Sequence, residues 1–306
     1  ASIIPFMAVV GEINQLEKTT FIGEIYHASG ITSERKFLFF LGIFVLLMLL
    51  VSALLSMFTV WRLSIFGNKL GVEIADRLYS FYLKKNWLFH ASGSSAQLTK
   101  KIAVETSRLT GGILIPFMQI NSRILFTFFT TIAIFIYDPV VSIIGLAIFT
   151  LSYFIVYKLV KNRLKNNGRA ISEMNEQRFR LMNEGFGGIK DVLLSGRDLD
   201  FIERFNKTGH IFANSLGINN ALAQLPRYLI ELIAFGSMIL LVLYLVFSSN
   251  GNLGLILPII SVYALTGFKL LPAFQQIYVG MANIKSNSAA FESIEKDLQE
   301  SKLNSR

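Results

Sequence analysis

Residues 37–61 read FLFFLGIFVLLMLLVSALLSMFTVW and contain no charged side chain. An α-helix rises about 1.5 Å per residue, so this stretch is long enough to cross a hydrocarbon core of roughly 30 Å. A helix satisfies its backbone hydrogen bonds internally, whereas the edges of an isolated strand would remain unpaired in lipid. The stretch therefore predicts a membrane-spanning helix.

Four further apolar stretches have a similar length: Ile113–Ile136, Val140–Val160, Leu229–Phe247 and Leu255–Met281. Residues 3–10 are apolar but too short to cross a bilayer. We expect them to be the outer end of a first helix that is truncated at its start, and a trimmed signal peptide is the alternative. The pattern predicts an all-α membrane protein with six transmembrane helices.

The composition supports a membrane protein and excludes several kinds of site. Of the 306 residues, 53% are hydrophobic and only 16% are charged, and a soluble domain would carry about 25% charged residues. The chain has no cysteine and three histidines that lie far apart in the sequence, which excludes disulfides and argues against a metal centre. The net charge of +9 would suit nucleic acid, unless the positions of the charges have another explanation.

Lysine and arginine collect in two segments, residues 62–108 and residues 158–207. Basic residues mark the cytoplasmic side of a membrane protein, so both segments are predicted to be cytoplasmic. The positive charge thus follows membrane topology, and we expect no nucleic-acid partner.

Both basic segments have the character of helices rather than loops. Arg163–Leu181 and Leu199–Leu222 contain no proline and are rich in helix formers. Ile74, Leu78, Phe81 and Tyr82 form an apolar stripe at helical spacing. We therefore expect the membrane helices to continue roughly 30–40 Å into the cytoplasm as two hairpins.

Each hairpin must reverse at its tip, and helix-breaking residues indicate where. In the first hairpin they are His90–Ser95, with Ser94 or Ser95 as an N-cap. In the second, Gly185, Gly187 and Gly188 precede residues 189–194, and Ser195–Asp198 follows. This spacing predicts a short helix across the second tip, and an ordinary solvated turn is the alternative.

Two stretches at these tips resemble the coupling helices of ABC exporters. They are residues 184–192 (EGFGGIKDV) with Gly196-Arg197-Asp198, and residues 86–90 (NWLFH) with Ser92-Gly93 and Gln97-Leu98. The resemblance covers the whole chain, 1–306, as one ABC transporter transmembrane domain. It implies that the residues coupled to an ATPase domain are Ser92, Gly93, Gln97, Leu98, Phe186, Gly187, Gly188 and Ile189.

The resemblance also implies partners. They are a second copy of the chain in a homodimer, membrane lipids, and an ATPase domain, expected to be fused after residue 306, that binds ATP and Mg²⁺. The sequence itself has no G-x-x-x-x-G-K-[S/T] phosphate loop, so we expect no catalytic site and no cofactor within these residues. The polar helix Phe291–Leu303 is expected to lead into that ATPase domain.

Within the family, the chain is most similar to flippases of lipid-linked oligosaccharides and to polysaccharide exporters. The similarity rests on Ile3–Phe6, Pro226–Glu231 and Lys269–Pro272, and on the loop 12–35 with an expected short helix across Phe21–His27. It implies a place in a bacterial inner membrane, and phosphate contacts by Arg227 and Lys269. Ser52 departs from the pattern, since the oligosaccharide flippases have a further basic residue there.

Four ionisable residues lie within or at the ends of the predicted spans: Arg123, Arg227, Glu231 and Lys269. A charge at that depth costs at least about 2.5–3.5 kcal/mol, which makes each a candidate for the substrate cavity. For Arg227 and Glu231, four residues apart, an ion pair is the structural alternative, and Arg227 can also reach the membrane boundary. Pairing across helices with Glu231 is the alternative for Arg123 and Lys269.

The sequence thus predicts the membrane part of an ATP-driven exporter or flippase that works by alternating access. The expected cargo is a lipid-linked oligosaccharide or a related amphipathic molecule. A lipid, a peptide or a drug is the alternative cargo, and a membrane scaffold or channel without an ATPase is the alternative of a different class.

Overall fold

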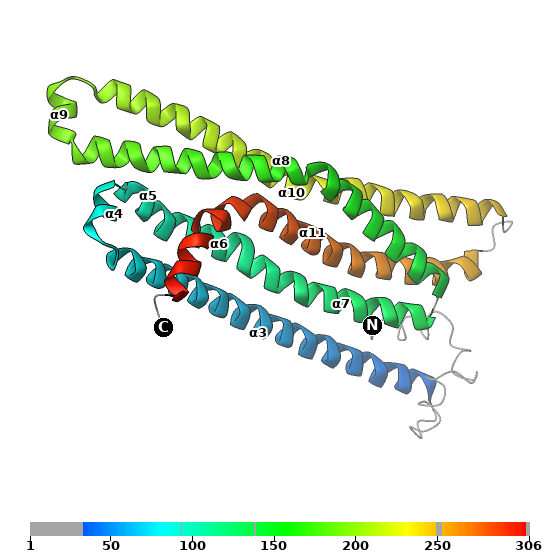
Figure 1. The fold of residues 1–306 in the computed structure, drawn as a ribbon. Coiled ribbons are helices and arrows are strands. Elements are labelled where there is room, and N and C mark those ends of the chain that lie inside the picture. Colours follow the sequence, from blue (N-terminus) through cyan, green and yellow to red (C-terminus); the bar gives the residue numbers. More distant parts are fainter. Residues whose placement is uncertain (1–32, 93, 138, 249–252, 304–306) are drawn as a thin grey trace. The chain divides into compact units, whose positions relative to one another are not determined.

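The computed structural model describes residues 33–92, 94–137, 139–248 and 253–303, and all regular structure within them is helical. The expected first helix and the loop 12–35, up to residue 32, lie outside the described residues. Figure 1 shows the elements, which are α3 (Glu34–Leu83), α4 (Trp87–Ser92), α5 (Ser95–Lys100), η2 (Lys101–Glu105), α6 (Thr106–Leu109), η3 (Thr110–Leu114), α7 (Ile115–Tyr137), α8 (Pro139–Gly187), α9 (Ile189–Leu194), α10 (Asp198–Ser248) and α11 (Leu253–Leu303).

Four helices are much longer than a bilayer requires. Helices α3, α8, α10 and α11 have 50, 49, 51 and 51 residues. At about 1.5 Å per residue each extends about 75 Å, more than twice the thickness of a hydrocarbon core. The prediction that these apolar stretches continue as helix into the polar segments is therefore confirmed for these elements.

Two helical stretches of the described residues are long and apolar enough to cross a membrane by length and composition, Arg35–Leu83 and Ser95–Ile132. They contain the predicted span 37–61 and most of the predicted span 113–136. The other three predicted spans include residues whose side chains lie outside the described part of the chain. The number of six spans therefore stays a prediction.

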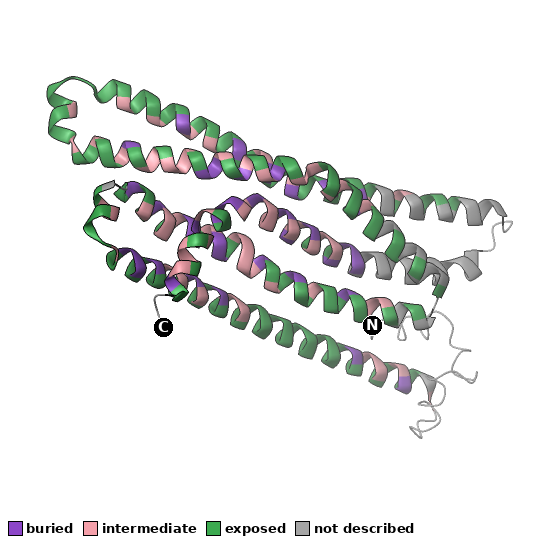
Figure 2. Cartoon of the chain, viewed as in Figure 1, coloured by how far each residue is buried: buried purple, intermediate pink, exposed green. Residues whose placement is uncertain are grey.

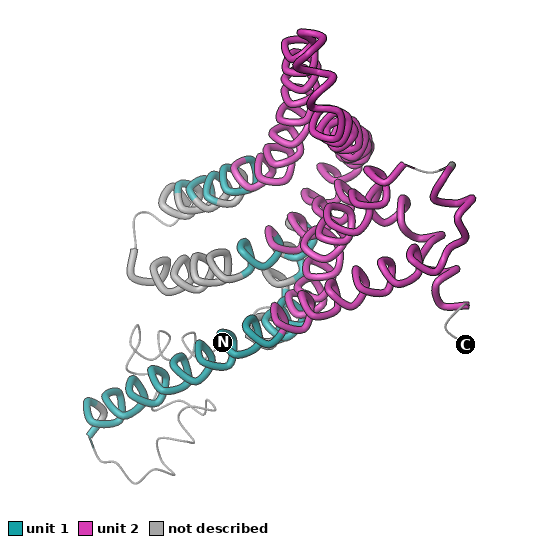
Figure 3. Tube along the Cα trace, turned by 90° about the vertical axis from the view of Figure 1, so that its left-hand side faces the viewer, with its two compact units in different colours: residues 1–62, 125–149, 229–274 teal, residues 63–124, 150–228, 275–306 magenta. Residues whose placement is uncertain are grey.

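The chain divides into two compact units (Figure 3). Unit 1 contains residues 1–62, 125–149 and 229–274, and unit 2 contains residues 63–124, 150–228 and 275–306. Unit 2 holds both hairpins: the first runs from the end of α3 through α4 to η3, and the second from α8 through α9 to α10. Every contact for which a distance is given below lies within unit 2.

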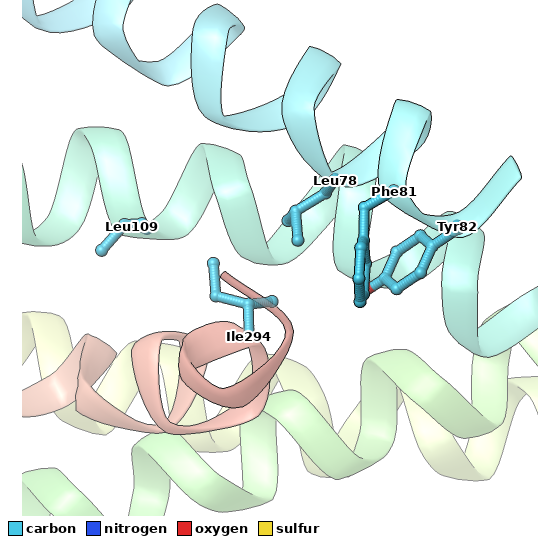
Figure 4. Packing of buried hydrophobic residues seen from close by; sticks show 5 residues of the cluster. All are labelled: Leu78, Phe81, Tyr82, Leu109 and Ile294. Carbon is cyan, nitrogen blue, oxygen red and sulfur yellow. The ribbon is translucent and has the colours of Figure 1, made fainter. Parts of the chain in front are cut away.

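A small hydrophobic core closes the first hairpin. Leu78, Phe81 and Tyr82 of α3 are buried against Leu109 of α6 and Ile294 of α11. Figure 4 shows Ile294 pointing between Leu109 and the α3 side chains, and Figure 2 shows buried residues along the end of α3 and in the last turns of α11. The predicted apolar stripe on α3 is therefore confirmed as a core face, with Ile74 packed at its edge.

Candidate functional site: the tips of the two hairpins

Helix α9 at the tip of the second hairpin has the bounds that the glycine and serine breakers predict. It begins after Gly188 and ends at Leu194. The N–H of Arg197 donates to the carbonyl of Val192 at 3.0 Å and that of Gly196 to the carbonyl of Leu193 at 3.2 Å, which is the Schellman pattern. This motif requires a left-handed residue after the helix end, and Gly196 supplies it with φ of 62°.

Apolar side chains project from this tip into solvent. Phe186 is 75% exposed, Leu194 77% and Leu199 72%. Exposed residues also dominate α9 and the adjoining ends of α8 and α10 in Figure 2. Large apolar side chains exposed on a polar hairpin make this tip a candidate contact surface for a partner.

The tip of the first hairpin lies slightly earlier than the predicted breakers. Helix α3 ends at Leu83 and α4 covers Trp87–Ser92, so His90 and Ser92 are helical. The reason is Asn86, whose Oδ1 accepts a hydrogen bond from the backbone N–H of Phe89 at 3.1 Å and so caps α4. The expected break is confirmed at Ser94, which occupies the N-cap position of α5.

The tip helix α4 is anchored through Phe89 and His90, and it also carries exposed apolar side chains. The ring of Phe89 stacks on Tyr82 with centroids 6.2 Å apart, and Nε2 of His90 donates to the carbonyl of Tyr82 at 3.0 Å. Trp87 and Leu88 are 81% and 74% exposed. As at the second tip, large apolar side chains therefore face outward from an anchored short helix.

The remaining residues predicted to couple to an ATPase domain differ in their surroundings. Gln97 is exposed on α5, and Leu98 packs against the core of the first hairpin. At the second tip, Gly187 ends α8 and Ile189 begins α9 with its side chain 46% exposed. Gly93 lies outside the described residues.

A known protein family matches most of the chain. Residues 2–268 match the model described as the ABC transporter transmembrane region. The chain belongs to this family. As an ABC transporter transmembrane region it is a membrane protein, and members of its family pair with an ATPase domain.

The hairpins of this ABC transporter transmembrane region are joined by a buried ionic network. Glu105 at the end of η2 is fully buried, and its two carboxylate oxygens lie 3.1 Å from Lys100 Nζ and 3.1 Å from Arg108 Nη1. The hydroxyl of Ser172 on α8 also donates to Glu105, and Lys100 reaches Glu176 of α8 at 3.1 Å. Opposite charges and hydrogen bonds therefore satisfy a carboxylate that burial alone would destabilise.

The same network reaches α11. Arg108 Nε donates to Asn287 Oδ1 at 3.1 Å, and Nη2 donates to the carbonyl of Gly168 at 3.3 Å. On α8, Lys165 lies 3.0 Å from Glu292 of α11, and this hydrogen bond holds the pKa of Glu292 below its ordinary value. Three elements of unit 2, namely the first hairpin, α8 and α11, are thus tied together by polar contacts.

The four candidates for the substrate cavity are not brought into one described site. Arg123 is half-buried on α7, and Arg227 is exposed on α10. Arg227 and Glu231 lie one turn apart on α10, and each takes part in an interaction. The side chain of Lys269 on α11 lies outside the described residues. The role of these four residues therefore stays a prediction.

Proposed function

We propose that this chain is the membrane domain of an ATP-driven exporter, and that the apolar tips of its two hairpins receive the movement of an ATPase domain. Two copies of the chain form the working dimer, and the substrate leaves the cytoplasmic leaflet by alternating access. The observation that carries the proposal is the exposure of large apolar side chains at both tips, in a chain of the ABC transporter family.

The tips suit a partner of this kind because each is a short helix with a defined cap. Asn86 caps α4, and the Schellman motif at Gly196 closes α9. Phe186 and Trp87 then project from fixed backbone positions, and such aromatic side chains are typical anchors of protein interfaces. A displacement of such a capped helix moves the long helices that it joins, whereas a flexible loop would change its own conformation instead.

The proposed cargo is an amphipathic lipid with a phosphate-bearing headgroup, of the class of lipid-linked oligosaccharides. Lys269 supports this class, since a charge within a membrane span costs at least about 2.5–3.5 kcal/mol and marks a functional site by default, and Arg227 lies at the start of the predicted span 229–247. The ammonium group of lysine and the guanidinium group of arginine both bind phosphate. A lipid, peptide or drug cargo would instead leave these cations with a structural role.

The test is transport by the protein with its ATPase domain in proteoliposomes. A fluorescent pyrophosphate-linked lipid oligosaccharide is placed in both leaflets, and a reducing agent that cannot cross the bilayer reports the outward-facing fraction. We expect this fraction to change with ATP and Mg²⁺ and to stay constant with a non-hydrolysable nucleotide. ATP hydrolysis with movement of another lipid, peptide or drug would change the cargo, and failure to bind any ATPase domain would favour a scaffold or channel.

A further inference from the structure

The last turns of α11 carry a carboxylate that lies between two parts of the first hairpin. Asp297 Oδ2 accepts a hydrogen bond from Tyr82 Oη at 2.6 Å and lies 2.6 Å from Lys101 Nζ. One turn later, Glu300 lies 3.1 Å from Lys85 Nζ. The side chains of Asp297 and Lys101 are each only 21% exposed, so solvent screens this pair less than an open surface pair.

An apolar contact on the same helix face supports these polar ones. Ile294 is fully buried in the core of the first hairpin, and Leu298 packs at its edge. With Asp297 and Ser301, these positions recur at steps of three and four residues, the spacing of one helix face. The end of α11 is therefore docked on the first hairpin through Ile294, Asp297 and Leu298, and Figure 1 shows its last turns beside α3 and α6.

Tyr82 connects this docked face to the tip helix α4. Its hydroxyl donates to Asp297, its ring stacks on Phe89, and its carbonyl accepts from His90. Tyr82 lies well beyond the predicted span 37–61, and burial together with Asp297 raises the pKa of its hydroxyl far above the ordinary value. The hydroxyl therefore keeps its proton at cellular pH and remains a donor.

We propose that Asp297 is a positioning residue, which fixes the tip helix α4 relative to the end of α11 through Tyr82. Movement imposed on α4 then reaches α11 directly, in addition to the path along α5, η2 and α6. This role in coupling rests on the proposed function, whereas the positioning itself is a property of the fold and is measurable without transport.

The chain contains no cysteine, so spin labels attach only to cysteines that are introduced, and the distance between α4 and α11 can be measured in this way. Nitroxide labels are attached to Ala91→Cys on α4 and Lys296→Cys on α11, two exposed positions, in the protein reconstituted in lipid nanodiscs. We expect a narrow distribution of label distances in the parent protein. Asp297→Asn and Tyr82→Phe should each broaden it, and Asp297→Glu should restore much of the narrow population.

Two controls separate positioning from a general loss of structure. Glu295→Gln removes a charge from the same helix at a residue whose described side-chain contact is with Gln299, four residues along α11. It should leave the distance distribution unchanged. A second label pair within the other hairpin, Lys190→Cys and Lys207→Cys, should keep its distances in every variant.

The functional readout is the number of substrate molecules moved per ATP hydrolysed. Asp297 makes two charge-assisted hydrogen bonds, so we expect Asp297→Asn to lower this ratio at least about tenfold. An unchanged α4–α11 distance in Asp297→Asn would overturn the proposal, and so would equal broadening of both label pairs. If the parent protein moves no substrate, the proposed function fails while the distance measurement still decides the positioning role.

Discussion

Gly168 of α8 lies so close to Ser286 of α11 that a Cβ atom at position 168 would overlap the carbonyl oxygen of Ser286. The neighbouring atom belongs to a backbone, which cannot rotate away as a side chain does. The carbonyl of Gly168 also accepts the hydrogen bond from Arg108. This contact therefore fixes the distance between two helices at the point where the ionic network of unit 2 joins them.

The first prediction follows from this contact. Gly168→Ala should lower the free energy of unfolding by about 1–3 kcal/mol, because the two helices must separate to accept the methyl group. Gly217→Ala on α10 is the matched control, since a Cβ there meets no atom within 4 Å. The control should keep or raise stability, because alanine favours a helix over glycine by about 1 kcal/mol. Thermal unfolding of the purified proteins in detergent compares them, and equal midpoints would contradict the prediction.

The second prediction concerns the buried carboxylate of Glu105. Glu105→Gln keeps the shape of the side chain but leaves Lys100 and Arg108 without their common counter-ion. We expect a loss of about 3–5 kcal/mol in the free energy of unfolding, the range found when one partner of a buried ion pair is removed. Unfolding by denaturant in mixed micelles measures the difference.

An exposed ion pair of the same chain provides the comparison. Asp200 lies 3.3 Å from Arg197 and 3.7 Å from Arg204 at the surface of the second hairpin. Asp200→Asn should change stability by less than about 0.5 kcal/mol, because exposed pairs are weak. A loss in Glu105→Gln as small as that in Asp200→Asn would show that the network does not hold the hairpins together.

The two tips show how far sequence reasoning reaches at short range. The bounds of α9 were predictable because Gly188 and Gly196 are local signals that act within a few residues. The first tip begins earlier than the breakers predict because Asn86 caps α4, so that His90 and Ser92 lie within this helix. A capping residue is weak evidence in a sequence, and the hydrogen bond from the N–H of Phe89 to Asn86 Oδ1 shows that this one acts as a cap.

Contacts between distant residues could not be predicted from one sequence. Glu105 accepts a hydrogen bond from the hydroxyl of Ser172, 67 residues away. Asp297 accepts one from the hydroxyl of Tyr82, 215 residues away. Helical spacing shows which face each residue lies on but not which helix covers that face. The spacing of Glu105 and Arg108 suits a pair within one turn, so this one pair of the ionic network had a local signal.

The third prediction tests the second tip as a contact for an ATPase domain. Phe186→Asp places a charge on the exposed apolar surface of α9 and its neighbours without touching the buried core. In the reconstituted protein with its ATPase domain, we expect substrate to stimulate ATP hydrolysis at least about tenfold less than in the parent protein, because an aromatic residue that anchors an interface contributes about 2 kcal/mol or more. Ile211→Asp, at an exposed position of α10 away from the tip, should keep the stimulation. Normal stimulation in Phe186→Asp would remove this tip from the coupling path.

The last prediction concerns Lys269 and the cargo. The residue lies within the predicted span 255–281, about 20 Å from its external start at 1.5 Å per residue. Lys269→Met keeps the length of the side chain and adds apolar surface, so a lysine with only a structural role should tolerate it. A lysine that binds a phosphate should not, because the ammonium group supplies the charge. We therefore expect Lys269→Met to reduce flipping of a pyrophosphate-linked lipid oligosaccharide more than about tenfold, the effect of losing one charged hydrogen bond.

Two further variants make this result specific. Lys269→Arg keeps the positive charge and should retain much of the flipping, at an equal amount of protein in the membrane. For Arg227 and Glu231, flipping by the double variant Arg227→Met with Glu231→Gln distinguishes the two roles. An ion pair predicts that the double variant is milder than Arg227→Met alone, because no unpaired charge remains, whereas a phosphate contact predicts that both are equally impaired. Full flipping by Lys269→Met would rule out the phosphate contact and favour a lipid, peptide or drug as the cargo.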